Sequence, residues 1–95
     1  MGRYFKAIIS WIQFEDGGRK KIPEQGMRYC PLIRIYKGQS HMEWSIDFIC
    51  PDFIQTFNIE FKFLSDAAPT HLIQVGETYE IYEGNKKVAE IKIIT

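Results

Sequence analysis

The sequence predicts an all-β fold, a single six-stranded antiparallel barrel that closes on itself. Apolar and polar residues alternate along most of the chain, turn residues separate the alternating runs, and no stretch shows a useful helical period. Aromatic residues make up 15% of the composition, and large flat side chains favour pleated, half-buried surfaces. Closure is favoured because so small an open sheet would expose unpaired edges.

Length and charge limit the classes of protein that fit. Ninety-five residues suit one domain, so residues 1–95 are expected to form a single unit with one core. The twelve basic and twelve acidic residues cancel, so no strong field draws the whole chain to nucleic acid or to an anionic membrane. No apolar run approaches the roughly 18 residues of a membrane helix, and the N-terminus does not resemble a signal peptide. We therefore expect a cytoplasmic protein without a membrane partner.

Two strands are expected in the first part of the chain. Residues Arg3–Phe14 alternate as a long strand, and Glu15–Gly18 ends it as a turn because glycine supplies the positive φ that other residues resist. Residues Arg19–Met27 are polar and form a loop. Tyr29–Tyr36 is the second strand, and Lys37–Ser40 is the turn that follows it.

The middle of the chain predicts two more strands. Met42–Ile49 alternates, with Trp44 on the same side as two further apolar residues. Cys50–Asp52 turns the chain, since proline and aspartate both favour turns. Gln55–Leu64 places Phe57, Ile59, Phe61 and Phe63 on one side and has the clearest alternation in the chain.

The C-terminal region predicts a β-hairpin. Ser65–Gly76 is a twelve-residue connection that precedes it. Two alternating runs then flank a short polar turn, Glu83–Lys86, which is the pattern of two strands that each bury one face.

Short pieces of the sequence resemble, in order and spacing, the third domain of elongation factor Tu. Glu15–Arg19 resembles that domain's acidic, double-glycine, arginine turn, and Gly26–Arg28 resembles the start of its second strand. Glu83-Gly84 with Lys86 and Val88 resembles its last hairpin. The similarity covers almost the whole chain and implies the same small β-barrel, here without a GTP-binding domain.

The resemblance also implies RNA binding, for which the basic loops supply cations. Glycines that bring the backbone close to a phosphate beside Arg19, Lys20 and Lys21 suit such a role. A solvated loop is the simpler interpretation, since most charge runs are only surface. The family's glutamine in the second strand, which contacts transfer RNA, is Cys30 here. The candidate RNA-binding residues are Arg19, Lys20, Lys21, Arg28, Lys86 and Lys87.

The aromatic residues give a second candidate surface. Most are expected to fill the barrel core, but tyrosine and tryptophan are also enriched at the centres of protein interfaces. In elongation factor Tu the third domain packs against two sister domains, so the resemblance implies a surface that must be covered, self-associate or bind a partner. The candidate interface residues are Tyr29, Tyr36, Trp44 and Tyr82.

No motif for catalysis or for a cofactor stands out. His41 and His71 have no second ligand at metal spacing, and Cys30 and Cys50 form no pair of the Cys-x-x-Cys type. Both thiols are expected to be buried and reduced. The phosphate-binding loop and the nucleophile motifs of hydrolases are absent from the sequence. We therefore expect no enzyme, no metal and no cofactor.

These observations favour a non-enzymatic module that binds another protein, or a second copy of itself as a homodimer. A small inhibitor or immunity-like protein is one form of this function. The alternative is an RNA- or transfer-RNA-binding domain, or a translation accessory, that uses the basic loops. Salt separates the two classes, because binding through phosphates weakens steeply as salt rises.

Overall fold

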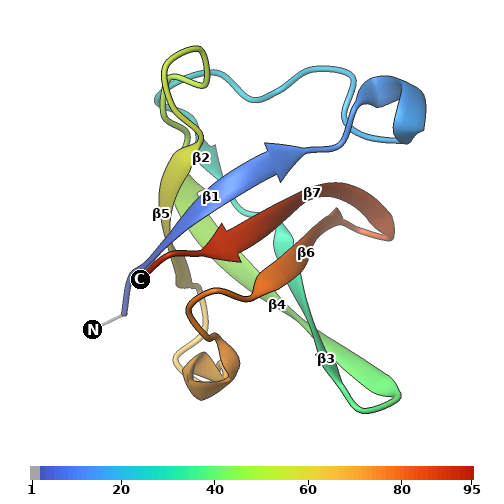
Figure 1. Ribbon diagram of the computed structural model, residues 1–95, viewed down its shortest axis with the longest axis vertical. Helices are drawn as coiled ribbons and strands as arrows, with labels where there is room; N and C mark the ends of the chain where they lie inside the picture. Colours follow the sequence, from blue (N-terminus) through green and yellow to red (C-terminus); the bar gives the residue numbers. More distant parts are fainter. Residues whose placement is uncertain (1–2) are drawn as a thin grey trace.

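The computed structural model describes residues 3–95; Met1 and Gly2, which the expected domain includes, lie outside the described residues. Figure 1 shows strands wrapped around one core, joined by loops that carry two short 3-10 helices. The elements in chain order are β1 (Phe5–Trp11), η1 (Phe14–Asp16), β2 (Arg28–Tyr29), β3 (Leu32–Lys37), β4 (Ser40–Ile49), β5 (Asn58–Phe63), η2 (Thr70–Leu72), β6 (Thr78–Glu83) and β7 (Lys86–Ile93). In this part of the chain neither helix has the length to cross a bilayer.

Six strands form a closed antiparallel barrel, as the sequence predicts. Their order is β4-β3-β6-β7-β1-β5, and β5 pairs again with β4 to complete the circle. Each strand of the circle is therefore paired on both sides over part of its length. The short strand β2 is one addition to the six, and it pairs with the end of β4.

The predicted strand Tyr29–Tyr36 is wrong in one respect, because it is interrupted at Cys30 and Pro31. The register does not change across the break: β2 and β3 face β4 in one continuous alignment. The carbonyl of Pro31 still accepts the N–H of Ile46 at 3.0 Å. Proline has no N–H to return, so the ladder loses one bond and β2 becomes separate from β3.

Two other predicted strands are shorter than expected. The predicted strand Arg3–Phe14 ends at Trp11, because the N–H of Ile12 makes the last bond to β7 and the chain then turns into η1. The predicted strand Gln55–Leu64 begins only at Asn58. The carbonyl of Asp52 accepts both the Gln55 and the Thr56 N–H at 3.0 Å, so this part of the predicted strand belongs to the preceding turn.

Both two-residue hairpin turns confirm the turn predictions. Gly38 (φ 63°) joins β3 to β4, and Gly84 (φ 60°) joins β6 to β7. Glycine at the first central position of a two-residue loop matches the twist of the flanking strands. A β-bulge follows in the second hairpin, where the register shifts between Ile81 and Tyr82. The carbonyl of Val88 at this bulge accepts the N–H of Ile12 from β1.

The core lies inside the barrel and follows from the alternation of each strand. Side chains at every second position point inward, and the largest fully buried ones come from β1, β3, β4, β5, β6 and β7. They include Phe5, Ile9, Ile33, Ile46, Phe61, Ile81, Ile91 and Ile93. Polar residues on the outward positions are therefore the ones that can form sites.

Candidate functional site

The six predicted RNA-binding cations do not form one free basic surface. Ion pairs with carboxylates occupy four of them, whereas Lys20 and Lys86 are exposed and have no ion pair with any residue in 3–95. The pairs are Arg19–Glu83, Lys21–Glu24 at 3.2 Å, Arg28–Asp47 at 2.9 Å, and Lys87 with Glu80 at 3.1 Å and Glu90 at 2.7 Å.

The basic cations also lie in different places. Arg19 joins the loop after β1 to the end of the β6–β7 hairpin through Glu83, so these two loops do meet. Arg28 lies against Asp47 on the outer face of β4, and it makes two bonds, at 2.9 and 3.2 Å. Lys87 lies on the outer face of β6 and β7. The structure therefore brings Arg19 close to the turn of the β6–β7 hairpin beside Lys86. The side chains of Arg28 and Lys87 are held elsewhere, on outer faces of the sheet, by carboxylates.

Of the predicted interface residues, Tyr29 packs against the barrel core. Its ring contacts Trp11 and Phe48, with centroids 5.8 and 5.5 Å apart, and its hydroxyl donates to the Glu83 carboxylate. The Arg19 guanidinium lies 5.4 Å from the ring centroid. Burial, together with the Glu83 carboxylate, raises the pKa of Tyr29. Tyr29 is thus half-buried and already partnered.

Trp44 is also half-buried. It packs against the core from β4, and its indole nitrogen has no hydrogen-bond partner among residues 3–95. Trp44 therefore presents little surface to a partner.

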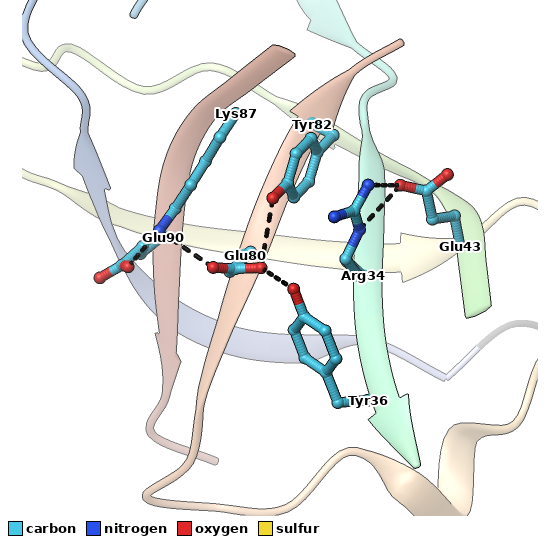
Figure 2. Close-up of polar contacts among 7 residues, drawn as sticks. All are labelled: Arg34, Tyr36, Glu43, Glu80, Tyr82, Lys87 and Glu90. Carbon is cyan, nitrogen blue, oxygen red and sulfur yellow. Dashed lines mark hydrogen bonds and ion pairs between the residues drawn. The ribbon is translucent and has the colours of Figure 1, made fainter. Parts of the chain in front are cut away.

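Tyr36 and Tyr82 do share one outer face, where a polar network spans β4, β3, β6 and β7 (Figure 2). The Glu80 carboxylate accepts the Tyr36 hydroxyl at 2.7 Å and the Tyr82 hydroxyl at 3.3 Å. The hydrogen bond from Tyr36 is the main reason why the pKa of Glu80 lies below its ordinary value. Lys87 holds the other side of the same carboxylate.

Arg34 covers Tyr82 within this network. Its guanidinium lies 3.8 Å from the centroid of the Tyr82 ring, which leaves Tyr82 only 9% exposed. Both nitrogens that face Glu43 donate to one carboxylate oxygen, at 2.7 and 3.0 Å. By contrast Tyr36 is 59% exposed, so it is the one predicted interface residue that a partner can reach freely.

Next to Tyr36 the sheet opens into a cleft of about 510 Å³. The pairing of β3 with β6 ends at Arg34 and Glu80, although β3 continues, paired with β4, as far as Lys37. The β3–β4 hairpin therefore projects beyond the barrel, as Figure 1 shows. The cleft is lined by Arg34, Ile35, Tyr36, Leu72, Gln74, Glu77, Thr78, Tyr79, Glu80 and Glu90.

Apart from Tyr36, the residues of this cleft were not predicted from the sequence as site residues. The alternation of polar residues in β6 is visible in the sequence, and it places Thr78, Glu80 and Tyr82 on the outer side. The pairing partner of β6 is not visible, because β6 follows β3 by some forty residues of sequence and pairs with it only in the folded barrel. The cleft depends on where that pairing stops.

A second, apolar groove of about 340 Å³ lies beside β1. Ile8, Trp11, Ile22 and Phe57 supply its apolar side chains, with Ile9, Ser10 and Gln13 completing the wall. Phe57 was expected to point inward with Ile59, but it is 46% exposed because the strand begins only after it.

The two cysteines differ in environment. Cys50 is buried, and burial raises the pKa of its thiol. The expectation that Cys30 is also buried is wrong: it lies exposed on the outward side beside Asp47, with its sulfur 3.8 Å from a carboxylate oxygen. Both thiols are free. Within residues 3–95, no three side chains of the metal-ligating types gather into a site.

A scan against protein-family models gives no match, and a search of curated proteins finds none that is similar to this chain.

Proposed function

We propose that this chain is a non-enzymatic protein-binding module, and that the cleft between β3 and β6 is its binding surface. The observation that carries the proposal is the sheet edge that the barrel leaves open there, beside the exposed ring of Tyr36. Open edges and exposed tyrosine side chains both favour contact with another chain. A small inhibitor or immunity-like protein in the cytoplasm is one form that such a module takes.

We further propose that the barrel is of the elongation factor Tu third-domain type. The turn Glu15–Arg19 and the hairpin around Glu83-Gly84 support this, because their order and spacing follow that family. The six-stranded closed circle is compatible with it.

RNA binding is the alternative, and the ion pairs make it the weaker one. A phosphate would have to replace a carboxylate on Arg19, Arg28 or Lys87, and each replacement sacrifices an existing contact. Lys20 and Lys86 favour the alternative, since both are exposed near the loops that Arg19 joins.

The two functions are separated by a tagged pull-down from lysate of the source organism, with half of the sample treated with ribonuclease. The cleft variant Tyr36→Ala/Glu77→Lys is compared with the loop variant Lys20→Glu/Lys86→Glu, which leaves the ion pairs of the other four cations intact. We expect a protein that survives ribonuclease, is lost with the cleft variant, and is retained with the loop variant.

Recovery of transfer or ribosomal RNA that is lost with the loop variant and with rising salt would contradict the proposal and support the alternative. A protein partner lost with neither variant would leave protein binding but move it away from the cleft.

A further inference from the structure

We propose that the cleft between β3 and β6 binds an extended peptide segment with basic side chains, which adds as a strand to the open edge of β3. This inference rests on the proposed function and names the class of its partner. It combines three features of the cleft: unpaired backbone groups, an excess of carboxylates and an apolar floor.

The unpaired backbone groups follow from the hairpin register. In a two-residue hairpin the residues that flank the turn exchange both hydrogen bonds, so Lys37 pairs in this way with Ser40. The direction of the backbone N–H and C=O groups then alternates along β3. Those of Ile35 point toward β4, and those of Arg34 and Tyr36 point toward β6. The backbone of Arg34 pairs with Glu80 of β6, whereas Tyr36 lies beyond the last β3–β6 pair.

The same alternation applies to β6. Gly76 and Glu77 bond to Ile93 of β7, so the backbone groups of Thr78 face the cleft. After Arg34 and Glu80, the next hydrogen-bonded pair of the β3–β6 ladder would be Tyr36 with Thr78, and that pair is absent. The β3–β6 ladder does not extend to either residue, and within residues 3–95 no loop backbone bonds to them. Each therefore offers one N–H and one carbonyl to an added strand.

The charges around these groups favour a basic segment. Two cations, Arg34 and Lys87, are already held by carboxylates at 2.7–3.1 Å. Lys92 lies opposite Thr78 and is a third cation on this face. The four carboxylates Glu43, Glu77, Glu80 and Glu90 still outnumber the three cations. Glu77 is exposed on the rim and makes no side-chain ion pair with any described residue. A lysine or arginine of the partner has a carboxylate to meet.

The floor of the cleft is apolar. Ile35 is buried, and Leu72 and Tyr79 are half-buried and pack against the core. Side chains of a strand alternate between two faces, so an added strand can place apolar residues on this floor and basic residues toward the carboxylates. The expected partner segment therefore alternates basic and apolar residues.

A second copy of this chain fits less well at the same edge. Two copies paired edge to edge would bring two acidic faces together, and like charges on neighbouring strands oppose pairing. The excess of carboxylates therefore points to a basic partner and away from a homodimer through the cleft.

The test is a titration of the ¹⁵N-labelled chain, followed by NMR, with a capped octapeptide of alternating lysine and valine. The control peptide alternates glutamate and valine. We expect the lysine peptide to shift the amide signals of Tyr36 and Thr78 in a saturable way, and the glutamate peptide to leave them in place. Glu77→Lys is expected to weaken binding of the lysine peptide about tenfold, as one lost charge-assisted contact does.

Two substitutions of Tyr36 separate the contribution of its backbone N–H to binding from that of its side chain. Tyr36→Pro removes the free N–H without removing a bond to β4, whereas Tyr36→Ala removes only the side chain. We expect Tyr36→Pro to abolish binding of the lysine peptide and Tyr36→Ala to weaken it only in part. The unchanged amide spectrum of β6 and β7 checks that each variant is folded.

Three outcomes would overturn the inference: no saturable shift at Tyr36 and Thr78, equal binding by the two Tyr36 variants, or shifts at these amides that grow with protein concentration alone. In each case a ribonuclease-resistant partner in the pull-down would leave the protein-binding function intact. If the pull-down recovers no ribonuclease-resistant protein, the proposed protein-binding function is contradicted, whether or not the peptide binds.

Discussion

The two adjacent glycines in the turn after β1, Gly17 and Gly18, are required for different reasons. Gly17 has φ +93°, a left-handed conformation, and a methyl group there would meet no atom within 4 Å. Gly18 is buried, and an added Cβ would lie 1.9 Å from the carbonyl oxygen of Ile12. Both glycines were expected to supply positive φ, whereas Gly18 is required by the close approach of two backbone segments.

We predict that Gly18→Ala destabilises the fold more than Gly17→Ala does. The left-handed strain at Gly17 costs about 1–2 kcal/mol. The overlap at Gly18 involves backbone and cannot be relieved by a side-chain rotation, so it costs about 3 kcal/mol or more. Urea unfolding of the two variants measures the difference, and equal losses would show that the turn can move away from Ile12.

Asp47 links stability to pH. Its hydrogen bonds with Arg28 hold the pKa of the carboxyl below its ordinary value in the folded state. The unfolded chain therefore takes up this proton first as the pH falls. The stabilisation is present above the unfolded pKa of about 3.9 and is lost as the pH falls through the lower, folded pKa.

We predict that Asp47→Asn reduces the loss of stability below pH 4. The free energy of unfolding of the wild type and the variant, measured between pH 5 and pH 2, should converge as the pH falls. Glu15→Gln is the matched control, since Glu15 is exposed in η1. Parallel pH profiles for the wild type and Asp47→Asn would mean that the Arg28–Asp47 pair does not persist in solution.

At the scale of elements, Tyr79 fixes the connection between β5 and β6. Its hydroxyl donates to the carbonyl of Leu72 at 2.8 Å and accepts the N–H of Gln74 at 3.0 Å. This places η2 and the residues after it against the start of β6, where they form the floor of the cleft. The connection looks irregular in sequence, but it is held by a side chain of the strand that follows it.

We predict that Tyr79→Phe lowers the free energy of unfolding by about 2 kcal/mol, since two hydrogen bonds contribute about 1 kcal/mol each. Amide exchange should accelerate at Gln74, whose N–H loses its acceptor. Tyr36→Phe serves as the control, because its bond to Glu80 is exposed and its loss should cost less than about 0.5 kcal/mol. An unchanged exchange rate at Gln74 would show that the Tyr79 hydroxyl does not hold this connection in solution.

The strands and hairpin turns were largely predictable from local sequence. Alternation predicted the strands and the shared side of Ile59, Phe61 and Phe63 in β5, and Gly38 and Gly84 marked the two-residue turns. The interruption at Pro31 was also readable in principle, because proline always removes a ladder donor.

The site was much less predictable, because it depends on contacts between distant segments. Lysine and arginine can be counted in the sequence, but the carboxylates that neutralise Arg19 and Arg28 come from other strands. Alternation likewise cannot show that the Tyr29 ring packs against Trp11 while Tyr36 stays exposed. The register between β3 and β6, and therefore the cleft, is a property of the whole barrel.

At the scale of the whole molecule, the circle of strands is closed but its pairing is incomplete. The β3–β4 hairpin runs past the barrel, and the last residues of β3 have one neighbouring strand instead of two. The proposed function and the proposed partner both depend on this open edge.

Amide hydrogen exchange along β3, measured residue by residue by NMR, tests the open edge most directly. We predict slow amide exchange at Arg34, whose N–H points to β6, and at Ile35, whose N–H points to β4. We predict fast exchange at Tyr36, whose N–H points to the β6 side beyond the end of the β3–β6 pairing. Protection of Tyr36 equal to that of Arg34 would show that pairing continues to Thr78, and that the cleft is closed in solution.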